Sequence, residues 1–336
     1  MTELGNQDLE KFWEIFMPHA SNELARIKGS DARFVHYTNA EAGLKILRSN
    51  RLILRNSTLM NDFSEVQHGL NCLIYAYNGP LGERLKQAMR VVQNDLPDII
   101  QDNFNSQMED FRHQTYLMSI SEHGNAEEGD ALEDLYGRLS MWRAYSKRNG
   151  IAFVVKNTPF VTETNALNAF TSPVLYATPD SFLPYFEQFV ASIEANIEFI
   201  SRFGGAMLHD AIMNAFRFTV QSTKHPSFHE EKEWRVIYSP TLLAKDGVLT
   251  PQQMERVPTE IMDLGGTPQR IYAIPFKNYP EDDFVGATIP ELIDRILIGP
   301  SPDAYAIADA FAAELSTKGI ENSRERIWIT GIPLRT

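Results

Sequence analysis

Apolar positions along the chain recur with two different spacings, and together they predict a mixed α+β fold. Residues 6–27 place Phe12 and Phe16 on one face at helical spacing, which predicts an amphipathic N-terminal helix. Residues 33–38 (RFVHYT) and 114–121 (QTYLMSIS) are rich in aromatic and β-branched side chains, which is typical of strands. Further strands are predicted at 51–55, 151–155, 174–177, 234–238, 270–276, 293–299 and 326–332.

The helical segments between these strands suggest how the chain is organised. Residues 81–112 predict two helices joined near Pro97, and residues 181–223 predict a long helical stretch with a break at Gly204. No Pro- or Ser-rich linker separates two independent domains. We therefore expect an N-terminal helix within 1–30, then one α+β domain over 31–336 with a helical insertion at about 181–223. The order of strands and helices argues against a regular βαβ repeat.

Composition and charge narrow the class of protein. The 336 residues are 43% hydrophobic and 22% charged, which is typical of a folded globular chain. The net charge of −13 disfavours extended non-specific contact with nucleic acid or anionic lipid. A single cysteine, Cys72, allows no intramolecular disulfide and agrees with a reducing compartment. Acidic residues stand where a signal peptide is basic, and no long apolar run occurs. We therefore expect a cytoplasmic protein with no membrane partner.

Several familiar catalytic signatures are absent from the sequence. It contains no GxGxxG turn, no GxxxxGK[ST] loop, no CxxC pair and no GxSxG elbow. His225 and His229 could suggest a metal pair, but Pro226 disfavours the helix that would bring them together. No metal site is therefore predicted.

His36 and Tyr37 are the first residues that could carry chemistry. They are neighbours on the predicted strand 33–38, so their side chains should point to opposite faces of a sheet. One should face a core and the other a cleft, and Thr38 follows them directly. A buried histidine with its hydrogen bonds satisfied is the alternative interpretation of His36.

Two later segments each allow a structural and a functional interpretation. Asn61, Asp62 and Glu65 fall in a polar turn, where such residues cap helices or border a ligand. Trp142 and Tyr145 are three residues apart on a predicted helix and share a face. Aromatic residues at this spacing build a core, or they form a stacking platform for a flat ring.

The segment 225–235 (HPSFHEEKEWR) is mostly polar and continues directly into the strand predicted at 234–238. Glu231 and Glu233 alternate on this extended chain and should point to the same face. Two carboxylates on one face repel each other and raise the pKa of one of them. A structural role requires that Lys224, Lys232 or Arg235 compensate the charge. The alternative is a strand entrance with solvated charges.

Taken in order, these motifs resemble an uncharacterised bacterial family defined as a domain of unknown function. The resemblance spans residues 33–335. Its motifs in this chain are a His-Tyr-Thr strand, an Asn-Asp-x-x-Glu turn, a Ser-x-Ser strand, a Trp-x-x-Tyr helix followed by glycine, and a Glu-x-Glu-Trp-Arg strand. The residues concerned are His36, Tyr37, Thr38, Asn61, Asp62, Glu65, Ser119, Ser121, Trp142, Tyr145, Gly150, Glu231, Glu233, Trp234 and Arg235.

A more distant resemblance suggests an activity. The segment 36–54 (HYTNAEAGLKILRSNRLIL) is similar to the opening of ADP-ribosyltransferase-fold enzymes. Ser119, Ser121, Glu231 and Glu233 resemble a toxin branch of that group. The resemblance implies an α+β fold with a mixed, largely antiparallel split sheet and helical insertions. It also implies NAD as substrate, with ADP-ribose transferred to an unknown macromolecular acceptor or NAD hydrolysed, in a toxin or phage-defence setting.

The same resemblance implies roles for individual residues. Glu233, or alternatively Glu231, would stabilise the cation that develops on the ribose, and His36 would bond a ribose hydroxyl. The remaining NAD-binding candidates are Tyr37, Thr38, Ser119, Ser121, Trp142, Tyr145 and Arg235. Two other functions stay open. One is a non-catalytic module that binds a nucleotide or a nucleic-acid end. The other is a metal-dependent nuclease that uses Asp62, Glu65, Glu231 and Glu233.

Overall fold

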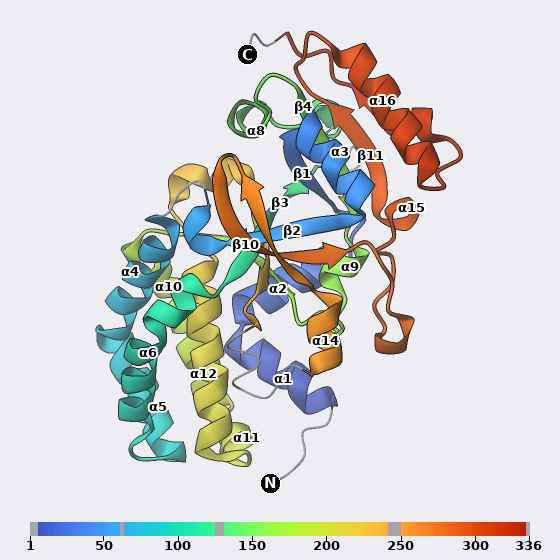
Figure 1. Cartoon of the computed structure of the whole chain (residues 1–336). Helices are drawn as coiled ribbons and strands as arrows, with labels where there is room; N and C mark the ends of the chain where they lie inside the picture. The colour runs from blue at the N-terminus through green and yellow to red at the C-terminus, as the bar shows by residue number, and fades with distance from the viewer. Residues whose placement is uncertain (1–5, 61–63, 125–130, 241–249, 334–336) are drawn as a thin grey trace. The chain divides into compact units, whose positions relative to one another are not determined.

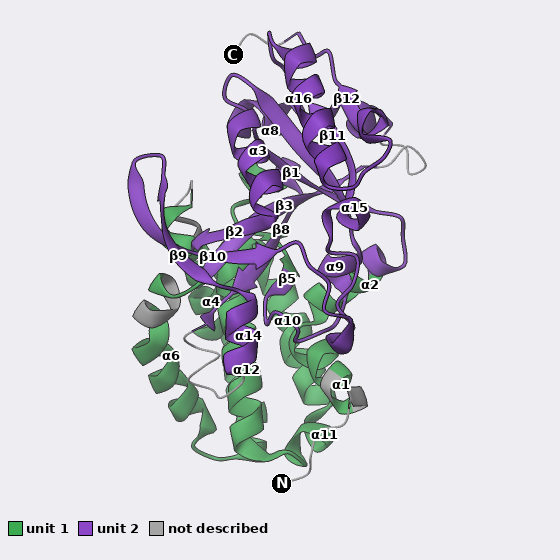
Figure 2. Cartoon of the chain, turned by 45° about the vertical axis from the view of Figure 1, so that its right-hand side comes forward, with its two compact units in different colours: residues 1–25, 57–115, 172–229 green, residues 26–56, 116–171, 230–336 purple. Residues whose placement is uncertain are grey.

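The chain folds into two compact units, each assembled from three separate stretches of sequence. The computed structural model describes residues 6–60, 64–124, 131–240 and 250–333 (Figure 1). Unit 1 comprises Met1–Ala25, Ser57–Thr115 and Ser172–His229, and unit 2 comprises Arg26–Asn56, Tyr116–Thr171 and Glu230–Thr336 (Figure 2). The prediction of a mixed α+β fold with a largely antiparallel sheet is confirmed.

Unit 2 is built on an open sheet whose neighbouring strands are antiparallel, except for the parallel pair at one edge. Along the sheet the order is β12-β11-β4-β1-β3-β2-β10-β9, with β8 paired to β3, and β11–β12 is the parallel pair. The strands are β1 (Arg33–Asn39), β2 (Arg51–Asn56), β3 (Tyr116–His123), β4 (Gly150–Lys156), β8 (Glu233–Tyr238), β9 (Thr259–Leu264), β10 (Thr267–Pro275), β11 (Ile293–Ile298) and β12 (Ile327–Ile329). The short strand β5 (Phe170–Pro173) also joins this sheet.

Strand β3 is the point at which the sheet opens. Its residues 121–123 pair with β1, and its residues 116–117 pair with β2. Over residues 116–121 it pairs with β8. Between the β1 and β2 pairings, residues 118–120 of β3 have no ladder partner in β1 or β2. Backbone groups of residues 118–120 on this side of β3 can therefore form hydrogen bonds with side chains.

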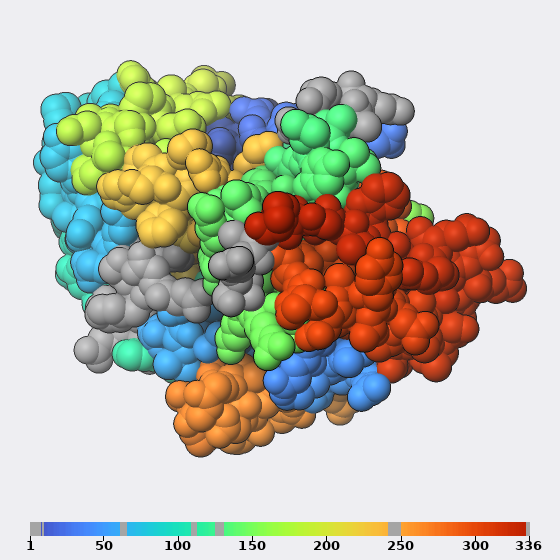
Figure 3. Space-filling view, turned by 90° about the horizontal axis from the view of Figure 1, so that it is seen from above, coloured from blue at the N-terminus to red at the C-terminus, as the bar shows by residue number. Residues whose placement is uncertain are grey.

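Short helices of unit 2 connect and cover these strands. Asn39 caps the helix that follows β1, as its sequence position predicts, because its Oδ1 accepts a hydrogen bond from the Ala42 N–H at 3.0 Å. Helix α16 packs against α3, β11 and β12 and lies on the surface seen from above (Figure 3, red). The helices are α3 (Ala40–Ser49), α7 (Ala131–Tyr136), α8 (Leu139–Tyr145), α9 (Thr158–Val161), α14 (Pro251–Arg256), α15 (Ile289–Leu292) and α16 (Ala304–Thr317), with 3-10 turns η3 (Pro280–Asp282) and η4 (Ser323–Arg326).

Unit 1 is mainly helical, and α4, α10 and α12 pack at its centre. Its helices are α1 (Asn6–Phe16), α4 (Ser64–Tyr77), α5 (Pro80–Val92), α6 (Leu96–His113), α10 (Pro179–Ala195), α11 (Ile197–Ser201) and α12 (Gly204–Gln221), with the turn η1 (Ser57–Leu59) and a small parallel pair, β6 (Leu175–Tyr176) and β7 (Thr223–Lys224). Helix α2 (Pro18–Lys28) and turn η2 (Pro226–Glu231) each cross from one unit to the other along the chain.

The N-terminal region differs from the single helix expected over residues 6–27. It forms two helices, α1 and α2, and the second begins at Pro18. Proline has no backbone N–H to donate to the preceding turn, and its fixed φ suits the first position of a helix. The expected break at Gly204 is present, because α12 begins there with a φ of +81°. None of the described helices is long and apolar enough to cross a bilayer.

Candidate functional site

The antiparallel pairing of β3 with β8 gathers four predicted residues on one face of the sheet in unit 2. Ser119 pairs with Arg235, and Ser121 pairs with Glu233. Paired residues of antiparallel strands point to the same face, and so do residues two apart along one strand. All four side chains therefore share a face, as expected for members of one site.

Glu233 is buried in a fully polar setting. Its side chain is 5% exposed, and that of Arg235 is 3% exposed. The Arg235 Nε donates to Glu233 Oε1 at 2.9 Å, a second guanidinium nitrogen donates to Oε2 at 3.2 Å, and the Ser119 hydroxyl donates to Oε1. A buried carboxylate is tolerated only when it is paired and hydrogen-bonded. Arg235 is thus the cation that compensates Glu233.

His36 meets this cluster from the other face of the sheet. Its ring lines a small cavity with Met118, Ile120 and Phe153, which are on the face opposite Ser119. Its Nδ1 lies 3.1 Å from the Ser119 carbonyl oxygen, in the stretch of β3 that has no β1 or β2 ladder partner. A carbonyl oxygen can only accept, so Nδ1 carries the proton in this contact. Burial lowers the pKa of His36, although the bond to Ser119 opposes that shift.

Tyr37 and Trp142 pack together in the core. The two rings meet edge to face, with centroids 4.9 Å apart, and Trp142 is 1% exposed. The Trp142 Nε1 donates to the Tyr136 carbonyl oxygen at 2.7 Å. Burial raises the pKa of Tyr37 to about 12, so the phenol stays protonated near neutral pH. Trp142 therefore occupies the core position that was one of the two interpretations of the Trp142–Tyr145 pair, and Tyr37 packs beside it in the same core cluster.

Tyr145 and Glu231 lie at the edge of the same region. Both are half-buried, and the Tyr145 hydroxyl lies 3.5 Å from Glu231 Oε1. Tyr145 thus keeps a partly exposed ring, unlike Trp142 on the same helix. Thr38 is half-buried near the end of β1, where it pairs with Ile151, and Ser121 is buried.

Arg138 is a residue of this region that sequence reasoning missed. Its guanidinium donates to the carbonyl oxygen of Glu231 at 2.8 Å, to that of Glu122, and to the Glu133 carboxylate at 2.7 Å. Its backbone N–H donates to the Tyr37 hydroxyl at 2.9 Å. One side chain therefore ties the start of β8 to the end of β3. Arg138 follows a stretch of the chain that is rich in acidic residues, and only its charge in that setting could have marked it.

The ionisable groups around Arg138 form a half-buried network. Burial alone would raise the pKa of Glu133, but the hydrogen bond and charge of Arg138 outweigh it and lower the pKa. Lys232 adds a contact of 3.4 Å to Glu133. Arg33 forms ion pairs with Asp134 and, at 2.8 Å, with Asp294. These pairs hold the start of β1 against α7 and β11.

Other predicted residues belong to unit 1 or lie outside the described residues. Asn61 and Asp62 lie outside the described residues, and Glu65 is in the first turn of α4. His225 and His229 belong to unit 1 and bond within their own turn, His225 Nδ1 with the Ser227 N–H and His229 Nδ1 with the Pro226 carbonyl oxygen. Within the described ranges, no group of three or more His, Cys, Asp or Glu side chains could hold a metal ion.

Comparison with known proteins identifies a family for the middle of the chain. Residues 141–236 match the model described as "Protein of unknown function (DUF2971)". This span is shorter than the expected 33–335 and includes Trp142, Tyr145, Glu231, Glu233 and Arg235. No curated protein and no solved structure matches the chain. Residues 141–236 are therefore similar to the domain of unknown function DUF2971, and the prediction of an uncharacterised family is confirmed for the motifs within this span.

Proposed function

We propose that unit 2 binds NAD and either transfers its ADP-ribose to a macromolecular acceptor or hydrolyses it, in the manner of an ADP-ribosyltransferase-fold enzyme. The supporting observation is the buried contact of Glu233 with Ser119 and Arg235 on paired strands. The opening of the sheet at β3 agrees with the split sheet that the sequence resemblance implies. The family match assigns no activity, so the proposal depends on these contacts and on that resemblance.

The chemistry requires a fixed negative charge beside a sugar. When the bond between ribose C1′ and the nicotinamide nitrogen breaks, its electron pair leaves with nicotinamide and C1′ becomes cationic. A carboxylate held in place before the reaction stabilises that cation without reorganisation at the moment of bond breaking. Glu233 has this property, because Arg235 and Ser119 fix both of its oxygens.

The neighbouring groups supply the other roles. Glu231 would accept the proton of the attacking water or acceptor nucleophile, because it is half-buried at the end of turn η2, two residues before Glu233. The half-buried ring of Tyr145, rather than the core ring of Trp142, would stack on nicotinamide. His36 would act as a positioning residue through the Ser119 carbonyl. Arg235 would contact pyrophosphate, because the planar guanidinium matches the geometry of phosphate oxygens.

The direct test is release of nicotinamide from NAD by the purified full chain, alone and with cell lysate as a source of acceptor. We expect release by the wild type and a loss of about 100-fold or more in Glu233→Gln, which keeps the shape of the side chain but removes its charge. Glu255→Gln is the matched control, because Glu255 is exposed in α14. Circular dichroism of each variant separates loss of chemistry from loss of fold.

The remaining outcomes identify the competing functions. Binding of NAD or of a nucleotide without any turnover would contradict the proposal and support a non-catalytic binding module. Cleavage of nucleic acid that stops when a chelator is added would support the metal-dependent nuclease. Release of nicotinamide that persists unchanged in Glu233→Gln would show that the carboxylate was assigned wrongly, and Glu231→Gln would then be tested next.

A further inference from the structure

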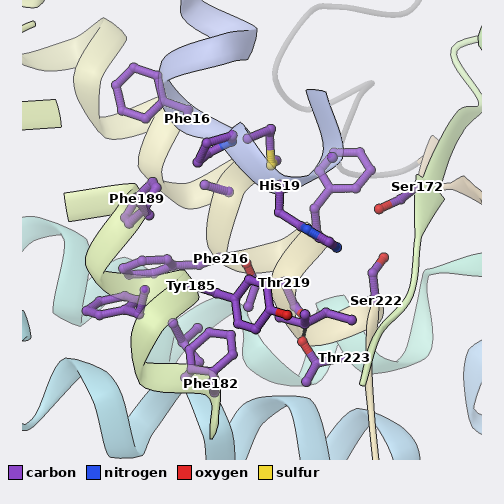
Figure 4. Close-up of a pocket in the computed structure, with 18 of the residues that line it drawn as sticks. Phe16, His19, Ser172, Phe182, Tyr185, Phe189, Phe216, Thr219, Ser222 and Thr223 are labelled. Carbon is purple, nitrogen blue, oxygen red and sulfur yellow. Dashed lines mark hydrogen bonds between the residues drawn. The ribbon is translucent and has the colours of Figure 1, made fainter. Parts of the chain in front are cut away.

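Unit 1 contains an apolar cavity that shares no residue with the candidate site of unit 2. Segments from the α1–α2 junction, α10 and α12 line it, and its volume is about 90 Å³ (Figure 4). The lining residues come from parts of the sequence that are about 200 positions apart, so the cavity exists only in the folded unit.

Phenylalanine rings form the inner wall of this cavity. Phe182, Phe186 and Phe189 recur along one face of α10, and Phe216 comes from α12. The centroids of Phe186 and Phe189 are 5.8 Å apart, and those of Phe189 and Phe216 are 6.3 Å apart. All four side chains are buried. These rings already contact one another, and a flat ring in the cavity would meet them in the tilted or edge-to-face contacts that aromatic pairs prefer.

His19 and Tyr185 mark where the cavity opens. Their rings meet edge to face with centroids 5.3 Å apart, and Tyr185 is 39% exposed, in contrast to the phenylalanines. Burial lowers the pKa of His19 although the charge of Glu23 opposes that shift, so the imidazole is neutral at pH 7. A neutral imidazole and a phenol at the entrance present no net charge to a ligand.

Ser222 supplies a polar group on the cavity wall. It is 6% exposed, and its Oγ has no hydrogen-bond partner among the described residues. In Figure 4 its hydroxyl and that of Ser172 lie on the same side of the cavity. A buried hydroxyl without a partner is unfavourable, so an acceptor atom on a ligand would be bound there with a gain in free energy.

The charge and size of the cavity restrict the ligand. None of the described residues that line it is Asp, Glu, Lys or Arg, so an ionised ligand would be desolvated without a counter-charge. A dry apolar cavity of about 150 Å³ is known to hold benzene. At about 90 Å³ the cavity here is smaller, so a single ring fits only with part of it in the opening beside Tyr185, and no larger body fits.

We infer that unit 1 binds a neutral single-ring aromatic molecule that carries a hydroxyl group, with the ring among Phe182, Phe186 and Phe189 and the hydroxyl toward Ser222. This site is independent of the proposed NAD chemistry, and its test does not require that activity.

Binding is measured on the full chain by NMR saturation transfer and titration with phenol, using benzene and benzoate as matched probes. We expect phenol to bind with a Kd at or below about 1 mM, benzene to bind about fivefold more weakly, and benzoate not to bind. Ser222→Ala should weaken phenol about fivefold and leave benzene unchanged. Ser106→Ala, an exposed serine of α6, should change neither.

A cavity-filling variant completes the test. Ala215 is buried in the wall, so Ala215→Leu should abolish binding of both phenol and benzene. The inference is overturned if phenol shows no saturation transfer, if benzoate binds as well as phenol, or if Ala215→Leu binds phenol like the wild type. If Ala215→Leu does not fold, the phenol-to-benzene affinity ratio in Ser222→Ala decides the question, and an unchanged ratio overturns the inference.

Discussion

His36 and Glu233 contact the same residue from the two faces of one sheet. The imidazole Nδ1 lies 3.1 Å from the Ser119 carbonyl oxygen, and the Ser119 hydroxyl donates to the Glu233 carboxylate. The carbonyl is in the stretch of β3 where neither β1 nor β2 provides a ladder partner. The histidine therefore supplies to this backbone oxygen the donor that a ladder partner supplies elsewhere, and Ser119 links His36 to Glu233.

The first prediction separates positioning by His36 from direct substrate contact. His36→Ala removes the donor to the Ser119 carbonyl and leaves a buried acceptor without its hydrogen bond, at a free-energy cost of roughly 1–3 kcal/mol. If about 1.4 kcal/mol of that cost raises the activation barrier, kcat for nicotinamide release should fall about tenfold. KM should stay unchanged. His36→Gln should recover most of kcat, since its amide can donate to the same oxygen. A raised KM with kcat retained would instead place His36 against the substrate.

The second prediction concerns the buried ion pair of Glu233 and Arg235. Each single variant, Glu233→Gln or Arg235→Met, leaves one buried charge without its partner and should lower the free energy of unfolding by about 3–5 kcal/mol. The double variant should lose less than the sum of the two, because it leaves neither charge uncompensated. Urea denaturation of the four proteins gives the coupling energy, and additive losses would contradict a direct pair.

The third prediction is a loss of stability in mild acid caused by His123. This ring is buried at the end of β3, its nitrogens have no hydrogen-bond partner among the described residues, and Nε2 lies 3.6 Å from Asp134. Burial, with a contribution from the charge of Arg33, lowers the pKa of His123 to about 4. The unfolded chain, with a pKa near 6.5, therefore binds the proton more tightly.

Stability from this group should accordingly be complete above about pH 6.5 and decline as the pH falls toward about 4. The total change is at most about 3 kcal/mol. Urea denaturation at a series of pH values measures it for the wild type and for His123→Asn. A variant with the same slope between pH 6.5 and pH 4 as the wild type would assign the acid sensitivity to other groups, of which His36 and His19 also have lowered pKa values.

Sequence periodicity predicted the α+β class and most strands, because the period of apolar positions depends on local geometry alone. The opposite orientation of His36 and Tyr37 followed from the same rule. The extended chain expected over Glu231 and Glu233 was wrong, because Glu231 ends the turn η2 and Lys232, between the two, has a φ of +42°. The sequence could not indicate where β1 leaves β3, since strand pairing joins residues far apart in the chain. The contact of His36 with Ser119 depends on that opening, and so does the separation of His36 from the face of Glu233.

Arg138 shows a second limit of sequence reasoning. Its importance comes from two carbonyl oxygens and one carboxylate that come together only in the folded unit. An arginine next to an acidic stretch is common on solvated surfaces, so the residue type and its position did not indicate these buried contacts. The Trp142 motif is different, because the spacing to Tyr145 predicted a shared helical face, and packing then decided that one ring enters the core and the other stays half-buried.

The last prediction explains why glycine follows β11. A Cβ at Gly299 would lie 2.6 Å from two carbon atoms of the Trp142 ring, and one at Gly150 would lie 3.1 Å from the same ring. The Gly299 N–H also donates to the Gly150 carbonyl oxygen at 2.9 Å, so the two glycines are held together beside the indole. A rigid ring in the core cannot move aside as a flexible side chain would. Gly299→Ala should therefore lower the free energy of unfolding by about 1–3 kcal/mol.

Near-ultraviolet circular dichroism should register the displaced indole in Gly299→Ala, while urea denaturation measures the loss of stability. Gly79→Ala is the control, because a Cβ there would meet its nearest atoms at 3.5 Å, an ordinary contact, and the cost should stay below about 1 kcal/mol. Equal losses in the two variants would mean that the Trp142 ring is not packed against Gly299. The core beneath the candidate site would then not require a glycine at this position.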